Sequence, residues 1–130
     1  MSINNRFTLE QIANCIEIWL TNGYIEANML ADNFKFISPF WKGSNKNEFL
    51  DKFLDPTTYT NTSLSKIIKF DPVIKFKSIS DDNNFAIILQ YHTRNGSSVY
   101  EAVLGTIKDG LLIELSSIYD LNETKNALEL

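Results

Sequence analysis

The sequence has one cysteine and one histidine, and these two scarcities exclude several kinds of site. A single cysteine cannot form a disulfide within the chain. A tetrahedral zinc site built by one chain would lack its usual thiolate and imidazole ligands. Cys15 lies among apolar residues at helical spacing, which indicates core packing more than a reactive thiol. We therefore expect no metal and no cofactor.

Long apolar runs and basic clusters are also missing. No run approaches the roughly 18 apolar residues of a membrane-spanning helix. The first six residues, Met-Ser-Ile-Asn-Asn-Arg, lack the apolar segment of a signal peptide. The net charge is −4, without the basic patch of a nucleic-acid-binding surface. We expect a cytoplasmic protein that binds neither nucleic acid nor membranes.

The composition is that of an ordinary globular domain. Hydrophobic residues make up 44%, aromatic residues 12% and charged residues 22% of the chain. A length of 130 residues is enough for one domain with a substantial core. No linker, repeat or low-complexity segment divides the chain, so we expect a single domain over residues 1–130.

Helix signals dominate the first half of the chain. Thr8 and Gln11 form a capping-box pattern before an apolar stripe at helical spacing, and Gly23 is placed to end this helix. A short second helix is predicted over residues 24–30. A strand then runs to Pro39, and Asn45 is placed to cap a further helix after Gly43.

Strand signals dominate the second half. Residues 67–79 alternate imperfectly and are interrupted at Asp71-Pro72. Strands over residues 85–94 and 98–107 are joined at Asn95-Gly96, and a last strand follows Asp109-Gly110. Residues 57–65 are predicted to form a polar loop, and residues 122–130 a short helix.

The two predicted turns assign the faces of this sheet. Pairing through Asn95-Gly96 sets Tyr91 opposite Tyr100, and pairing through Asp109-Gly110 sets Tyr100 opposite Tyr119. The predicted inner face carries Phe85, Ile87, Leu89, Tyr91, Tyr100, Ala102, Leu104, Thr106, Ile113, Leu115, Ser117 and Tyr119. The predicted outer face is mixed, and it carries Ile88, Gln90, His92, Val99, Glu101, Val103, Ile107, Leu112, Glu114 and Ile118. Such a mixed face suggests a homodimer.

The order of these elements resembles the nuclear transport factor two-like superfamily, which includes the SnoaL-like polyketide cyclases and the ketosteroid isomerases. The resemblance is carried by Asn22-Gly23, Leu30-Ala31-Asp32-Asn33, Ser38-Pro39, Gly43 before a helix, Lys108-Asp109-Gly110 and Tyr119-Asp120. It implies an α+β fold, a cone-shaped cystatin-like roll whose curved antiparallel or mixed sheet wraps around the N-terminal helix. It also implies a pocket at the mouth of the cone and, as in many members, a dimer through the outer sheet face.

The isomerase chemistry does not carry over with the resemblance. Ser38 stands before the proline, where the isomerases place a general-base Asp, and a serine hydroxyl is too weak a base for a carbon-bound proton. Ile16 and Val103 fall near the positions of the two oxyanion donors. We therefore expect no ketosteroid isomerase activity.

The predicted pocket takes a small apolar or aromatic molecule. Its candidate ligand-binding residues are Phe36, Ser38, Phe40, Trp41, Leu89, Tyr91, Tyr100, Leu115 and Tyr119. Phe40 and Trp41 could instead close the core, and the tyrosine hydroxyls could instead reach water at the mouth of the cone.

Two weak candidates for a catalytic base remain. Asp120 resembles an acid at the end of the last strand in the SnoaL-like cyclases, although capping of the last helix also explains it. His92 shares the predicted outer face with Gln90 and Glu101, and these groups would enter the cone if the register were one residue different. The sequence leaves three functions open: a ligand-binding SnoaL-like protein, an isomerase, cyclase or dehydratase, and a protein-interaction domain.

Overall fold

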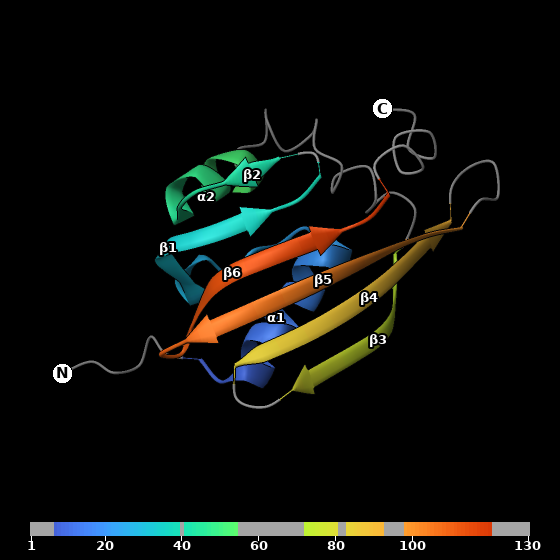
Figure 1. The fold of residues 1–130 in the computed structure, drawn as a ribbon, viewed down its shortest axis with the longest axis horizontal. Helices are drawn as coiled ribbons and strands as arrows, with labels where there is room; N and C mark the ends of the chain where they lie inside the picture. Colours follow the sequence, from blue (N-terminus) through green and yellow to red (C-terminus); the bar gives the residue numbers. More distant parts are fainter. Residues whose placement is uncertain (1–6, 40, 55–71, 81–82, 93–97, 121–130) are drawn as a thin grey trace.

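The computed structural model describes residues 7–39, 41–54, 72–80, 83–92 and 98–120. Its elements are α1 (Leu9–Asn22), the 3-10 turn η1 (Ala27–Met29), β1 (Leu30–Ile37), β2 (Lys42–Gly43), α2 (Lys46–Leu54), β3 (Val73–Ser80), β4 (Asn84–His92), β5 (Ser98–Lys108) and β6 (Leu111–Ile118). The strands form one sheet in the order β2-β1-β6-β5-β4-β3, in which β1 and β6 are parallel and the other pairs antiparallel (Figure 1). The predicted α+β class is confirmed.

The helix caps follow the local signals of the sequence. The Thr8 hydroxyl accepts a hydrogen bond from Gln11 N at 3.1 Å, and Thr8 N donates to Gln11 Oε1 at 2.9 Å. Gly23 ends α1 with φ 81°, a left-handed conformation that glycine adopts without a Cβ penalty. Asn45 Oδ1 accepts from Glu48 N at 3.0 Å at the start of α2. The predicted caps at Thr8, Gly23 and Asn45 are confirmed.

The predicted helix over residues 24–30 is wrong. Only the three-residue turn η1 forms there, and Leu30 already belongs to β1, where it pairs with Leu112 of β6. The side chains of Met29 and Leu30 are buried in the core. Tertiary pairing with β6 therefore overrides the weak helical pattern of this segment.

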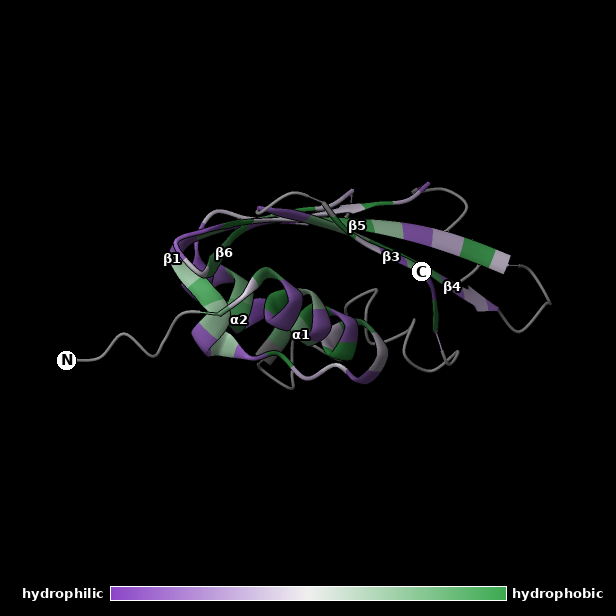
Figure 2. Cartoon of the chain, turned by 90° about the horizontal axis from the view of Figure 1, so that it is seen from below, coloured by the Kyte–Doolittle hydropathy of each residue, from purple (hydrophilic) through white to green (hydrophobic). Residues whose placement is uncertain are grey.

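Both helices lie on the same side of the curved sheet (Figure 2). On that inner side α1 contributes Ile12, Ile16 and Leu20 to the core, and Phe49 of α2 packs 5.0 Å from Phe34 of β1, measured between ring centroids. At the other edge, Lys77 of β3 donates to Asn14 of α1 at 2.7 Å. The inner face of the sheet is therefore the core face.

The pairing of β4 with β5 differs by one residue from the predicted register. Tyr91 pairs with Val99 and Leu89 pairs with Glu101, where the sequence predicted Tyr100 and Ala102. A shift of one residue moves every side chain of a strand to the opposite face. The predicted turn at Asn95-Gly96 lies outside the described residues.

A β-bulge produces the same shift between β5 and β6. The predicted turn at Asp109-Gly110 is confirmed, with φ values of 55° and 78°, and Lys108 pairs with Leu111. An irregularity between Thr106 and Ile107 then moves the register, so that Val103 pairs with Ser117. As a result β4 keeps its predicted faces and β5 is reversed. The strand β6 keeps its predicted faces after the bulge, whereas Leu112 before the bulge is buried inside.

The reversal of β5 and the bulge near the start of β6 correct both predicted faces. Tyr100 and Leu104, predicted to face the helices, are 57% and 44% exposed on the outer face. Ala102 and Thr106 alternate with the buried residues of β5 and share that outer face. Five residues predicted on the outer face are buried inside instead: Val99, Glu101, Val103, Ile107 and Leu112.

Three other predictions lie outside the described residues: the polar loop over 57–65, the strand before Pro72, and the helix over 122–130. Within the described part of the chain, no helix is long and apolar enough to cross a membrane.

Candidate functional site

The inner face of the sheet changes character along the strands. Near the Asp109-Gly110 turn it is wholly apolar, with Phe85 of β4, Ile107 of β5 and Leu112 of β6. Toward the other end of the same strands it becomes polar. The described part of the chain buries three polar or charged side chains, those of Ser38, Glu101 and Ser117. All three lie at this second end.

Strand pairing brings these three residues together on neighbouring strands. Ser38 directly follows Ile37, which pairs with Ser116 in the parallel ladder of β1 and β6, so Ser38 lies beside Ser117. Ser117 pairs with Val103 of β5, and Glu101 is the next inward residue of that strand. On the side of Glu101 away from Ser117 lies β4. Its Leu89 pairs with Glu101, and Tyr91 is the next inward residue of β4.

The Ser38 hydroxyl makes two hydrogen bonds within the turn between β1 and β2. It donates to the Trp41 carbonyl oxygen at 2.7 Å and accepts from Trp41 N at 3.0 Å. These two bonds fix the backbone between the end of β1 and the start of β2. Because its proton is already donated to a carbonyl, Ser38 holds the turn and has only acceptor capacity left.

Glu101 is the one carboxyl group buried in the described core. Its side chain is 6% exposed, and Oε2 accepts a hydrogen bond from the Ser117 hydroxyl at 2.6 Å. The other oxygen, Oε1, has no hydrogen-bond partner among the described residues. Burial raises the pKa of Glu101 to about 7, against the smaller lowering effect of the Ser117 hydrogen bond. Glu101 can therefore exchange a proton near neutral pH.

Trp19 carries a second buried polar atom in the core. Its indole is 3% exposed, and Nε1 has no hydrogen-bond partner in the described part of the chain. Its ring lies edge-on to Phe36, at 6.0 Å between ring centroids, and Phe36 pairs with Leu115 two residues before Ser117. Buried polar atoms without protein partners commonly mark a place for water or a ligand.

The structure brings together several of the predicted ligand-binding residues. Phe36, Leu89, Tyr91 and Leu115 are buried on the inner side, and Tyr119 is half-buried just after β6. Tyr100 lies on the outer face, where it is exposed, and Phe40 lies outside the described residues. The ligand-binding role of the inward residues stays a prediction.

The two weak candidates for a base are exposed. Asp120 follows β6 with an exposed side chain, and His92 is exposed on the outer face, where its Nδ1 lies 3.0 Å from the Ser98 hydroxyl. Of Gln90, His92 and Glu101, which a register shifted by one residue would bring inside together, only Glu101 enters the core. Sequence reasoning missed Glu101 as an inward residue. The β-branched residues Val99, Val103 and Ile107 share the face of Glu101, but the other face of β5 is also apolar, so this signal was weak.

The positions of the isomerase donors hold apolar residues in the structure. Ile16 and Val103 are both fully buried and neither can donate a hydrogen bond from its side chain. Glu101, however, lies on the same face two residues before Val103. The acidic side chain of Glu101 therefore lies near Val103 on the inner face, where the register predicted from the sequence placed no acid.

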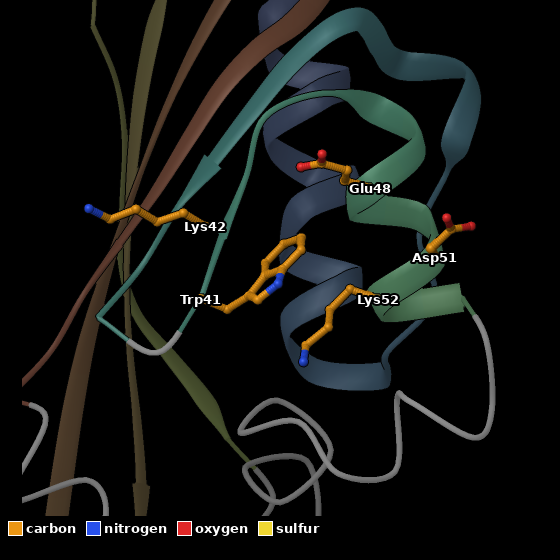
Figure 3. A pocket seen from close by; sticks show the side chains of 5 residues that line it. All are labelled: Trp41, Lys42, Glu48, Asp51 and Lys52. Carbon is orange, nitrogen blue, oxygen red and sulfur yellow. The ribbon is translucent and has the colours of Figure 1, made fainter.

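Trp41 borders an open pocket of about 340 Å³ beside α2 (Figure 3). The pocket is lined by Trp41, Lys42, Glu48, Asp51 and Lys52. Lys52 Nζ lies 5.7 Å from the Trp41 ring centroid, whereas Lys42 and Asp51 point away from the indole. A Cβ on Gly43 would lie 2.6 Å from Trp41 Cη2, so glycine makes room for the indole against β2. The charged groups here do not converge on one point.

No known family model matches this chain, and no curated protein matches it. Solved structures are similar over nearly the whole chain. A nuclear transport factor two-like protein of unknown function from Cytophaga hutchinsonii is 14% identical with a TM-score of 0.59, covering 93% of this chain and 97% of its own. A putative SnoaL-like polyketide cyclase from Jannaschia is 11% identical with a TM-score of 0.64, covering 98% and 96%.

A third similar structure contains a small molecule. It is a hypothetical protein with a ketosteroid isomerase-like fold from Catenulispora acidiphila, in complex with trimethylamine. It is 10% identical with a TM-score of 0.61, covering 92% of this chain and 93% of its own. Together with the curved mixed sheet over α1, these similarities show that the chain has the nuclear transport factor two-like cone fold. The fold predicted from the sequence is confirmed.

Proposed function

We propose that this protein is a SnoaL-like protein that binds a small apolar or aromatic molecule on the inner side of its sheet. The observation that carries this proposal is the buried Oε1 atom of Glu101, which has no hydrogen-bond partner among the described residues. An unpaired buried carboxyl oxygen costs free energy, about 1 to 3 kcal/mol or more. A ligand at this point would recover that cost.

The surroundings of Glu101 support an apolar ligand with few polar groups. Leu89 lies opposite Glu101 on β4, and Tyr91 and Val99 extend the wall toward the end of the hairpin. Concave sites for small molecules are typically lined by apolar and aromatic side chains with a small number of placed polar groups. The trimethylamine complex adds support, since it shows a protein of similar fold together with a small molecule.

A thermal-shift screen of apolar aromatic and polycyclic compounds tests the proposal. A ligand at a hundred times its dissociation constant adds about 2.7 kcal/mol of stability. For a domain of this size that is a melting shift on the order of 10 °C. We expect at least one such compound to raise the melting temperature by several degrees and to change tryptophan emission.

Two variants test where such a compound binds. Tyr119→Trp adds bulk beside the polar end of β6 and should weaken both effects. Glu114→Gln is the matched control, because Glu114 pairs with Thr106 on the outer side and should leave both effects intact. A broad screen without any shift, or a shift that Tyr119→Trp does not alter, would show that the inner face is core and not a site.

A second candidate function is an enzyme of the isomerase, cyclase or dehydratase type. The observation that favours it is the pKa of Glu101, raised to about 7, since a general acid or base works best with a pKa near the operating pH. In this candidate Glu101 takes the role considered for Asp120 and His92, which are exposed. Turnover that is lost in Glu101→Gln and retained in His92→Ala and Asp120→Asn would favour it.

A further inference from the structure

We infer that the inner site selects a small cationic amine with an apolar body, whose ammonium group donates a hydrogen bond to Glu101 Oε1. The inference rests on the proposed function, because it requires a ligand on the inner side of the sheet. It adds the charge of the ligand and a dependence of binding on the protonation of Glu101.

The hydrogen bonding of Glu101 leaves a place for a donor. Ser117 donates to Oε2 at 2.6 Å, an interaction that favours the ionised carboxylate. An ionised carboxylate only accepts hydrogen bonds, and Oε1 has no partner among the described residues. The group that completes this carboxylate must therefore be a donor, and a charged donor gives the stronger bond.

Among the described residues, the charged groups around Glu101 do not supply a cation. On the inner side Lys77 of β3 is held by α1, where it donates to Asn14 and lies 3.9 Å from Glu17. The helices and strands of this part of the fold carry the following titratable side chains: Glu10, Cys15 and Glu17 on α1, Lys46, Glu48, Asp51 and Lys52 on α2, Tyr91 on β4, and Tyr119 and Asp120 after β6. On the outer face the strands carry His92, Tyr100, Lys108 and Glu114. No described lysine or histidine lies on the inner faces of β4, β5 or β6.

A cation from solution would compensate this buried charge. An uncompensated buried charge is strongly destabilising, and a partner with good geometry removes most of that penalty. Aromatic side chains also attract ammonium groups through their ring faces, and the buried Tyr91 is the next inward residue after Leu89, which pairs with Glu101. The net charge of −4 favours the approach of cations over anions.

Binding of such an amine is linked to loss of the Glu101 proton. Because burial raises the pKa of Glu101 to about 7, the carboxyl group is largely neutral at pH 5.5 and largely ionised at pH 8.5. The amine should therefore bind about 30-fold more tightly at the higher pH, if it binds only the ionised form. Near pH 7 each binding event should release about half a proton to the buffer.

Isothermal titration with benzylamine and benzyl alcohol tests the inference on the intact protein. Both probes share one apolar body, and benzylamine stays mostly protonated throughout this pH range. We expect the affinity for benzylamine to rise with pH and the affinity for benzyl alcohol to stay flat. Glu101→Gln should remove the rise for benzylamine and retain the binding of benzyl alcohol. Glu114→Gln should behave as the unaltered protein.

The outcomes separate this inference from the proposed function. If benzyl alcohol binds and benzylamine does not bind more tightly at high pH, the inference is wrong and the inner site still takes an apolar ligand. If benzylamine binds with the same pH dependence in Glu101→Gln, another group holds it and the inference is again wrong. If neither probe nor any compound of the thermal-shift screen binds, both proposals fail.

Discussion

Glu101 places an ionisable carboxyl group where the neighbouring strands bury aliphatic and aromatic side chains. Leu89 lies opposite Glu101 on β4. On β6, the hydroxyl of Ser117 donates a hydrogen bond to Glu101. The residues that pack against Leu89 and Val103 gain stability from burial, whereas the carboxyl group loses its hydration. A residue that costs stability in this way is a reasonable place to look for function.

This cost predicts a particular pH dependence of stability. The pKa of Glu101 is raised from 4.5 to about 7 in the folded protein, so the unfolded chain ionises first as the pH rises. The contribution of Glu101 to the free energy of unfolding is fully present below about pH 4.5 and is lost as the pH rises through about 7. Glutamine at this position has no charge to desolvate.

We expect Glu101→Gln to gain stability relative to the unaltered protein between pH 5 and pH 8, by about 2 to 3 kcal/mol. Urea denaturation at several pH values measures the difference between the two free energies of unfolding. Glu114→Gln on the outer side should show no such trend. Parallel pH profiles for Glu101→Gln and the unaltered protein would mean that Glu101 titrates normally in the folded state.

At the scale of elements, β5 depends on a glycine. Phe85 of β4 pairs with Gly105, and a Cβ at this position would lie 2.1 Å from Phe85 Cζ. The Phe85 ring therefore covers the backbone of β5 where a side chain would otherwise stand. Both residues lie at the apolar end of the inner face, and the strand stays buried there without a side chain of its own.

We expect Gly105→Ala to lower the free energy of unfolding by about 1 to 3 kcal/mol, because the methyl group displaces the Phe85 ring in a packed core. Urea denaturation measures the loss. In a double-mutant cycle, Phe85→Leu should cost less in the Gly105→Ala background than alone, since the smaller side chain makes room. Additive losses in the cycle would show that the two residues do not compete for the same space.

The sequence predicted the elements whose signals are local. Thr8 with Gln11, Gly23, Asn45 and Asp109-Gly110 each set a cap or turn through their own backbone and side-chain chemistry. These signals fixed the helix positions and the last hairpin, and with them most of the topology. The inward positions of Leu89, Tyr91 and Leu115 follow from the period of two along single strands.

The sequence could not predict the register of β5. Its two faces are similarly apolar, Val99, Val103 and Ile107 on one and Tyr100, Ala102 and Leu104 on the other, so periodicity does not choose between them. The choice depends on a bulge near Thr106 and on the register of the β4 pairing. The site was therefore incomplete at the sequence level, because Glu101 changes face with the register.

At the scale of the whole molecule, the outer face of the sheet is unusually apolar. Exposed large side chains on it include Phe76 of β3, Tyr100 and Leu104 of β5, and Ile118 of β6. These strands, with β4 between β3 and β5, are neighbours in the sheet. Both described helices lie on the opposite side (Figure 2). Contiguous apolar surface of this kind is more typical of a protein interface than of a surface that stays exposed to solvent.

We expect a homodimer through this face, with Tyr100 and Leu104 near its centre in place of the predicted Val99, Val103 and Leu112. A stable interface typically buries roughly 800 Å² on each partner. Sedimentation velocity at tens of micromolar should show a dimer, and Leu104→Lys should yield a folded monomer, because two lysines would then face each other across the interface. Ile18→Lys is the matched control, since Ile18 is also exposed but lies on α1, and it should leave the dimer intact. A monomer for the unaltered protein, or a dimer that survives Leu104→Lys and is lost in Ile18→Lys, would place the assembly surface elsewhere.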